Sequence, residues 1–292
     1  MKKRKGIILA GGTGSRLFPI TLAISKQLMP VYDKPMIYYP LSSLMLSGIR
    51  EFLIISNPHH LNAFKNLLGD GKSLGIDIQY APQKKPDGIA QSLIIAEEFL
   101  SGSSIALILG DNLFHGNELI PKLEKAFNKE DGGTIFAYPV SDPWRYGVIN
   151  INKKGEPISI EEKPSNPKSR YAITGLYFYD NSAVLKAKNL KPSKRGELEI
   201  STINEMFLKE SKLNVEIMGR GMAWLDTGTL ESLSEASDYI RALEKRQGLK
   251  IGSPEEVAWR KGWIKDNELE KIANYLDSSN YGNYLLEILK NK

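Results

Sequence analysis

The sequence predicts an α/β protein with a central, mostly parallel sheet and helices on both of its faces. Short apolar runs with the length of strands alternate with longer segments that have helical spacing. The first apolar run, residues 7–10, opens directly into the glycine-rich residues 11–14. The run at residues 105–109 is apolar throughout, which is typical of a strand that is buried on both faces.

The expected elements follow one another in the order that such a sheet requires. In the first half we expect strands at residues 7–10, 52–56, 78–81 and 105–109, and helices at residues 36–47, 61–68 and 89–100. In the second half we expect strands at residues 134–140, 148–151, 158–161 and 173–179, with few helices among them. These later strands should extend the same sheet in antiparallel or mixed fashion.

The end of the chain has a helical character. Apolar residues recur at helical spacing between Leu230 and Leu243, which predicts an amphipathic helix over residues 229–247. Shorter helices should follow from Pro254, with breaks near Gly262 and residues 278–282. We therefore divide the chain into a core, residues 1–247, and a small helical C-terminal segment, residues 248–292, with a regulatory or oligomer-forming role.

Composition narrows the class of protein. The 292 residues are 41% hydrophobic and 25% charged, with a net charge of +5, as in a globular protein with small anionic substrates. The basic residues form no nucleic-acid motif, and no apolar run is long enough for a membrane span. We expect residues 1–5 to be a solvated basic tail rather than part of a signal peptide. The absence of cysteine excludes disulfides and thiolate catalysis, and fits a cytoplasmic protein.

The glycine-rich loop is the strongest local signal. Glycines let the backbone approach a ligand, and their bare N–H groups form a cradle for phosphate oxygens. The loop is neither a P-loop nor a dinucleotide fingerprint, because Leu17 stands where a third glycine is required. The alternative is an ordinary tight turn, but Arg16 and residues 25–27 favour a triphosphate site. Its candidate residues are Gly11, Gly12, Thr13, Gly14, Ser15 and Arg16.

Two aspartates follow short apolar segments. Asp111 comes directly after residues 105–110, and Asp226 ends the segment Trp-Leu-Asp. If the two carboxylates meet in space, they and bound phosphates make a magnesium site. The alternative for each is an aspartate in a turn or a helix cap. The histidines His59, His60 and His115 have no zinc spacing, and we assign no nucleophile.

Two lysines and two glutamines complete the candidates. Lys26 lies close to the glycine loop in sequence, and Lys163 ends an expected strand. Both lie beside prolines, although a lysine is most often a solvated surface residue. Gln27 and Gln83 carry amides that match the edge of a pyrimidine, and Gly88 allows close approach of a base or sugar. The alternative for each glutamine is again the surface.

Seven segments together resemble one family, the glucose-1-phosphate thymidylyltransferases among the sugar nucleotidyltransferases. The resemblance extends over residues 6–264. The block SKQLMPVYDKPMIYYPLS is the most specific part, since other sugar nucleotidyltransferases share the phosphate loop. The segments are GGTGSRL at 11–17, that block at 25–42, GDN at 110–112, YGV at 146–148, EEKP at 161–164, TGLYFYD at 174–180 and WLDTGT at 224–229.

The resemblance implies a Rossmann-like nucleotidyltransferase fold, and an enzyme that makes dTDP-glucose and pyrophosphate from dTTP and glucose 1-phosphate with Mg²⁺. The product would enter synthesis of deoxysugars of the dTDP-rhamnose type. The glycine loop and Lys26 would hold the triphosphate, Gln27, Gln83 and Gly88 the thymine, and Asp111 and Asp226 the metal. The glucose 1-phosphate would contact Asn112, Tyr146, Gly147, Glu162, Lys163 and Thr174. Charge neutralisation would come from Arg16, Lys26 and Lys163.

The family is also tetrameric and carries a second nucleotide site for feedback by the pathway end product. The residues that the resemblance assigns to it are Gly116, Gly219, Glu256 and Arg260. His115 stands where the family pattern has a tyrosine.

Three other functions compete with this one. A uridylyltransferase is the first alternative. Uracil lacks only the methyl group of thymine, and burial of that group in a pocket contributes about 1 kcal/mol to binding. A non-catalytic nucleotide-sugar sensor would not need Arg16, Asp111 and Asp226, yet all three are present. A glycosyltransferase that uses a nucleotide sugar would more often have Asp-x-Asp at the metal strand, where this chain has Asp-Asn-Leu.

Overall fold

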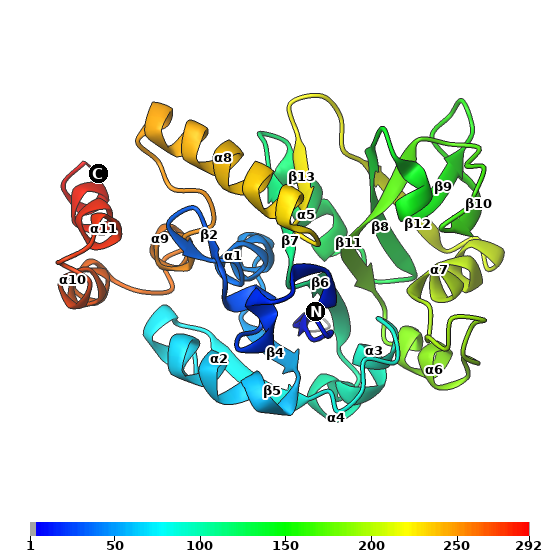
Figure 1. Cartoon of the computed structure of the whole chain (residues 1–292), viewed down its shortest axis with the longest axis horizontal. Helices are drawn as coiled ribbons and strands as arrows, with labels where there is room; N and C mark the ends of the chain where they lie inside the picture. The colour runs from blue at the N-terminus through cyan, green and yellow to red at the C-terminus, as the bar shows by residue number, and fades with distance from the viewer. Residues whose placement is uncertain (1–3, 292) are drawn as a thin grey trace.

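The computed structural model describes residues 4–291, in which nine strands form one mixed, mostly parallel sheet between helices (Figure 1). The expected α/β class is confirmed. Along the sheet the order is β10-β9-β11-β6-β1-β4-β5, and β8 joins β11 to β12. The strands are β1 (Arg4–Ala10), β4 (Glu51–Ser56), β5 (Asp77–Pro82), β6 (Ser104–Leu109), β8 (Gly133–Pro139), β9 (Gly147–Ile151), β10 (Pro157–Glu162), β11 (Tyr171–Tyr179) and β12 (Leu213–Ile217).

The central parallel strands β1, β4 and β6 are buried on both faces, as their continuous apolar sequences predict. β1 lies between β4 and β6, and Ile8 pairs with Ile54 on one side and Ile108 on the other. These three residues belong to the core on one face of the sheet. Ile7, one position earlier, belongs to the core on the opposite face. This alternation fixes the register, because a slip by one residue would exchange the two faces.

The second half extends the sheet as expected but contains more helix than expected. β11 is antiparallel to β6, β8 and β9. Residues 133–179 contain no α-helix, so the expectation of few helices among these strands is confirmed, but three helices that we did not expect precede or follow them. Leu119, Leu123 and Ala126 of the first are buried at helical spacing, which is an amphipathic pattern that the short strand signals concealed. These helices are α5 (Leu119–Asn128), α6 (Ser182–Lys188) and α7 (Ile200–Lys209).

The remaining helices surround the sheet and form the C-terminal segment. The expected helix over 89–100 is divided in two at Ala96. The break expected at residues 278–282 lies slightly earlier, because Gly282 is buried in the first turn of the last helix and closely approaches the carbonyl of Leu276. These helices are α1 (Tyr38–Leu46), α2 (Leu61–Leu68), α3 (Gln91–Ile95), α4 (Glu97–Leu100), α8 (Leu230–Gln247), α9 (Pro254–Arg260), α10 (Asp266–Tyr275) and α11 (Asn280–Lys290).

Arg4 and Lys5, the described part of the basic N-terminal segment, are not the solvated tail that we expect from sequence. Residues 1–3 lie outside the described part, but β1 begins at Arg4, which is 5% exposed. Its guanidinium donates to the carbonyl oxygens of Ile105 and Lys129, each over 2.6 Å. Hydrogen bonds to backbone carbonyls and contact with the Phe178 ring compensate for burial of this charge.

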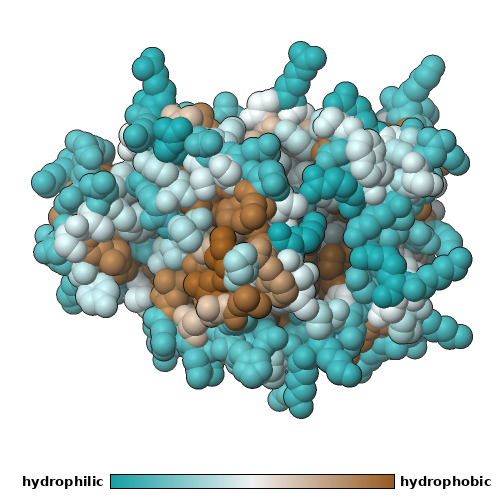
Figure 2. All heavy atoms as spheres, viewed as in Figure 1, coloured by the Kyte–Doolittle hydropathy of each residue, from teal (hydrophilic) through white to brown (hydrophobic). Residues whose placement is uncertain are grey.

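The surface has one notable apolar area on the face of Figure 1. Figure 2 shows brown atoms gathered over the N-terminal segment that Figure 1 colours blue. The large apolar residues exposed in this segment are Phe18, Ile20 and Leu22. No helix among residues 4–291 combines the length and apolarity that crossing a membrane requires.

Candidate active site

Two aspartates from distant parts of the chain lie together at the carboxyl edge of the sheet. β1 and β6 are parallel neighbours, so Gly11 and Asp111 both follow strands that end at this edge. β7 (Asn112–His115) and β13 (Ala223–Asp226) form an antiparallel pair that sets Asp226 opposite Asn112. The N–H of Thr227 then donates to the carbonyl oxygen of Asp111 over 3.1 Å. The ladder therefore brings the second aspartate beside the first.

The two carboxylates have opposite pKa shifts. Burial, and then the charge of Asp111, raise the pKa of Asp226 to about 6. Burial also opposes ionisation of Asp111, but Lys26 outweighs it. The charge of Lys26 and a hydrogen bond from its Nζ to Asp111 Oδ2 lower the pKa of Asp111. The charges of Lys26, Arg16 and Arg145 lower the pKa of Asp226 but do not offset burial and the charge of Asp111.

This pair fits a divalent cation. Carboxylate oxygens are hard ligands, and Mg²⁺ is usually bound by one or two of them together with substrate phosphates and water. The raised pKa of Asp226 indicates that a cation placed between the two carboxylates would relieve their repulsion. Residues 4–291 hold no cluster of three or more His, Asp or Glu side chains that could bind a metal, so phosphate oxygens would complete the coordination.

The glycine-rich loop borders a narrow cavity of about 160 Å³. Gly12 and Gly14 have φ angles of 93° and 63°, which other residues adopt only with strain. Arg16 lines this cavity and the larger one beside it. A Cβ on Gly228 would lie 2.9 Å from Arg16 Nη2, so this glycine makes room for the guanidinium. Sequence reasoning assigned no role to Gly228, although it lies in the quoted WLDTGT segment. The cavity is lined by Gly12, Thr13, Gly14, Ser15, Arg16, Lys26 and Gly228.

The larger cavity has a volume of about 370 Å³ and reaches from Arg16 and the aspartates toward β9–β11. It contains most of the residues expected for the sugar phosphate, namely Asn112, Tyr146, Gly147, Glu162 and Lys163. Thr174 does not line it and is fully buried. Its neighbours Ile173 and Gly175 do line it, in keeping with the alternation of a strand.

Several charged side chains of this cavity were missed by sequence reasoning. Arg195 forms ion pairs with Glu197 at 2.9 Å and with Glu199 at 3.3 Å. A third carboxylate, Glu162, lies 3.7 Å away, and its pKa is raised chiefly by burial. Residues 195–199 lie between α6 and α7 in a polar stretch without periodicity, so only the tertiary fold reveals them. Arg145 of the same cavity was likewise not predicted.

The two glutamines flank Gly11. Gln27 is 2% exposed and Gln83 is 4% exposed, so neither is a surface residue. Gln27 Nε2 donates to the carbonyl oxygen of Gly11 over 3.4 Å, and Ser25 Oγ donates to Gln27 Oε1 over 2.6 Å. Gln83 Oε1 occupies the space that a Cβ on Gly11 would need. Gly88, with φ 109°, packs closely on the backbone of Leu198.

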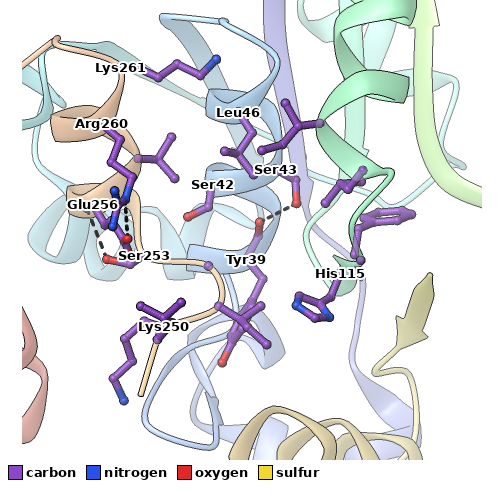
Figure 3. A pocket seen from close by; sticks show the side chains of 18 of the residues that line it. Tyr39, Ser42, Ser43, Leu46, His115, Lys250, Ser253, Glu256, Arg260 and Lys261 are labelled. Atoms are coloured by element: carbon purple, nitrogen blue, oxygen red, sulfur yellow. Dashed lines mark hydrogen bonds and ion pairs between the residues drawn. The ribbon is translucent and has the colours of Figure 1, made fainter. Parts of the chain in front are cut away.

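A cavity of about 430 Å³, the second of the two large ones, is lined in part by α1. Figure 3 shows side chains of α1, including Ser42, facing Glu256 and Arg260 of α9. Gly116 also lines this cavity, whereas Gly219 does not. The hydroxyl of Ser42 is buried without a hydrogen-bond partner. His115 also lines it, and burial lowers the pKa of this imidazole.

Comparison with known proteins agrees with this arrangement. The family model described as nucleotidyl transferase matches residues 5–242. The chain belongs to this family. A glucose-1-phosphate thymidylyltransferase of Neisseria meningitidis is 55% identical over 98% of this chain and 99% of its own length. The enzyme of the same name from Mycobacterium tuberculosis is 54% identical with the same coverage.

Solved structures agree as well. A Bacillus anthracis protein assigned as a glucose-1-phosphate thymidylyltransferase, in complex with sucrose, has a TM-score of 0.76 and 43% identity over 82% of this chain and 95% of its own. A UDP-glucose pyrophosphorylase with bound UDP-glucose has a TM-score of 0.74. Its identity is 22% over 85% of this chain and 100% of its own, so it supports the fold alone.

Proposed function

We propose that this nucleotidyltransferase transfers a thymidylyl group from dTTP to α-D-glucose 1-phosphate, giving dTDP-glucose and pyrophosphate. The product would enter synthesis of deoxysugars of the dTDP-rhamnose type. The names of relatives 54–55% identical over nearly the whole chain support this substrate pair. The observation that carries the proposal is structural. The loop cavity of about 160 Å³ and the larger cavity of about 370 Å³ share Arg16, next to the buried Asp111 and the half-buried Asp226.

In the proposed reaction an oxygen of the sugar phosphate attacks the α-phosphorus of dTTP in line. A new P–O bond forms, the bond to the β-phosphate oxygen breaks, and pyrophosphate leaves with that electron pair. The attacking oxygen is already anionic, so the protein supplies no general base. Its task is to align anions that repel one another, and alignment can contribute about 7–11 kcal/mol to lowering the barrier.

The cationic side chains act on these phosphates. Arg16, between the two cavities, is positioned for the transferred group, and Lys163 for the sugar phosphate. Lys26 pairs with Asp111 in this structure and would turn to the triphosphate when a cation takes its place. Mg²⁺ held by Asp111 and Asp226 would supply charge neutralisation of the triphosphate.

Recognition of the two substrates falls to separate groups. The amides of Gln27 and Gln83 and the backbone of Gly88 are assigned to the thymine. The glycine loop, Gly11 to Ser15, is assigned to the phosphates. The sugar phosphate is assigned to Asn112, Tyr146, Gly147, Glu162 and Lys163, which line the larger cavity, and to Thr174, whose side chain is buried and does not line it.

We also propose that the second cavity binds a nucleotide and carries feedback, with Gly116, Glu256 and Arg260 among its contacts and Gly219 in the loop nearby. Ser42 and three cations, Lys250, Arg260 and Lys261, offer donors to phosphate there. In this proposal the enzyme is a cytoplasmic homotetramer. The boundary between the core and the regulatory segment 248–292 lies in the connection between α8 and α9.

The direct test is pyrophosphate release from the four deoxyribonucleoside triphosphates and UTP, each with several sugar 1-phosphates. The proposal expects the highest kcat/KM for dTTP with glucose 1-phosphate. Equal or better use of UTP would instead identify a uridylyltransferase. No release with any pair, in protein that still binds nucleotide, would identify a sensor.

A further inference from the structure

Three side chains form a hydrogen-bonded chain that leads from the surface to the glycine loop. The amide Nε2 of Gln83 donates to Oε1 of Gln91 over 2.7 Å. The amide Nε2 of Gln91 donates to Oδ2 of Asp87 over 3.1 Å. At the inner end of the chain, Gln83 Oε1 lies against Gly11. The site described above uses Gln83 but neither Gln91 nor Asp87.

The orientation of the Gln91 amide is forced by its partners. The carboxylate of Asp87 can only accept a hydrogen bond, and the backbone N–H of Asp87 can only donate one. Gln91 meets both, because its Nε2 faces the carboxylate and its Oε1 accepts from the Asp87 N–H over 3.3 Å. Turning the Gln91 amide by 180° would place its N–H group against the backbone N–H of Asp87 and its oxygen against the Asp87 carboxylate.

The forced orientation passes on to Gln83. Since Gln91 presents an oxygen, the Gln83 group that faces it must be Nε2, and Oε1 must point the other way. The loop that carries Asp87 is itself held, because Leu198 N donates to Asp87 O over 2.7 Å and Ala90 N donates to Leu198 O over 3.2 Å. Without such an anchor the two ends of an amide are nearly equal in size, and only hydrogen-bond polarity distinguishes them.

We propose that Gln91, held by Asp87, is a positioning residue that fixes the Gln83 amide with its oxygen toward the nucleobase. An oxygen there accepts the N3–H of a keto pyrimidine. Cytosine has an unprotonated N3 and would meet that oxygen with a lone pair, so the same geometry rejects dCTP. This inference rests on the proposed function and assigns base selection to a residue that does not touch the base.

Two variants test this hydrogen-bonded relay from Asp87 through Gln91 to Gln83, and in both the substituted side chains are close in size to the original ones. Gln91→Leu removes all three hydrogen bonds of Gln91 and frees Gln83 to turn. The exchange Asp87→Asn/Gln91→Glu reverses the outer hydrogen bond but keeps an oxygen facing Gln83 and the backbone N–H of residue 87. The measured quantity is the ratio of kcat/KM for dTTP to that for dCTP, because general loss of folded or active enzyme leaves this ratio unchanged.

We expect Gln91→Leu to lower this ratio about tenfold or more, mainly through KM, since a buried polar group without its partner costs about 1–3 kcal/mol. The exchange variant should retain the wild-type ratio within about threefold. A wild-type ratio in Gln91→Leu, or an equal loss in both variants, would overturn the relay while leaving the proposed function standing. Wild-type protein without activity toward dTTP would overturn the proposed function itself.

Discussion

The cavity at the sheet edge and the cavity beside α9 are similar in size and differ in their charges. The first, of about 370 Å³, is lined by five carboxylates and four cationic side chains, counted as Asp111, Glu162, Glu197, Glu199 and Asp226 against Arg16, Arg145, Lys163 and Arg195. The second, of about 430 Å³, is lined by one carboxylate, Glu256, and three cations, Lys250, Arg260 and Lys261. The second can hold an anion through its cations alone, whereas the first also has carboxylates to bind a metal.

The two cavities also differ in how they are built. Strand ends of the buried sheet position the aspartates of the first, so the backbone there is fixed by ladder hydrogen bonds. The second is bordered by the connection from α8 to α9, which Glu244 holds in place. Glu244 accepts from Lys250 over 2.8 Å, from Lys34 over 2.7 Å and from Ile251 N over 2.9 Å. The proposed catalytic site is thus built on strand ends, whereas the proposed second nucleotide site is built mainly on helices and their connection.

The largest effect should come from crowding Gly11, which packs against the Gln83 amide. Gly11→Ala puts a Cβ where Gln83 Oε1 lies, so the base amide must move. We expect kcat/KM for dTTP to fall about a hundredfold, since misplacement by about 1 Å can cost about 10²-fold. Steady-state kinetics measure this. If displacement of Gln83 is the cause, Gly11→Ala/Gln83→Ala should be no worse than Gln83→Ala alone, and additive losses would count against it.

A smaller effect concerns the free energy of unfolding of the metal-free protein. The folded-state pKa of Asp226 is raised from 3.8 to about 6, so its ionised form destabilises the fold above about pH 6 and not below about pH 4. Asp226→Asn should therefore stabilise the fold by about 3 kcal/mol at pH 7.5 and by only about 0.5 kcal/mol at pH 4. Thermal unfolding at both pH values measures this. Exposed Asp238→Asn is the control, and an equal gain at both pH values would contradict the shift.

The smallest effect belongs to the second cavity. Arg260 pairs with Glu256 at 2.7 Å and lines this cavity. Arg260→Ala should weaken a second equivalent of bound nucleotide about tenfold, because one charge-assisted hydrogen bond is worth about 1.5–3 kcal/mol. Calorimetric titration with dTTP should give two equivalents per chain in the wild type and one tight equivalent in the variant. Two tight equivalents in both proteins would exclude Arg260 from the second site, and a single equivalent in the wild type would leave the cavity without a nucleotide role. Arg241→Ala on exposed α8 is the control.

The parts of the fold that sequence could predict are those with a local pattern. β1 ends where its apolar run meets the glycines, and β6 ends where its apolar run gives way to the segment with Asp111. The sequence itself therefore marks the end of each strand. The segment over 230–247 carries its own cap, since Thr229 Oγ1 accepts from Ser232 N over 3.2 Å. From the sequence, the proximity of Asp226 to Asp111 could only be hypothesised. The β7–β13 ladder that brings Asp226 close is visible only in the structure.

The parts that sequence could not predict depend on tertiary contacts. Arg195 and its carboxylates lie in a loop, where no periodicity marks a side chain as facing a cavity. Arg4 is buried because distant segments offer carbonyl oxygens to its guanidinium. The prediction that Arg4 belongs to a solvated tail is therefore wrong. The Gln83–Gln91 hydrogen bond likewise depends on the conformation of the turn between the two residues, which the sequence pattern does not predict.

The central claim is that Asp111 and Asp226 hold one divalent cation at the edge of the sheet. The most direct measurement is Mn²⁺ binding by electron paramagnetic resonance in the presence of dTTP, for the wild type and Asp111→Asn. We predict one tight Mn²⁺ per chain in the wild type, and in the variant at least about tenfold weaker binding with turnover lower by about a hundredfold. Equal Mn²⁺ affinity and near-normal turnover in folded Asp111→Asn would contradict the account.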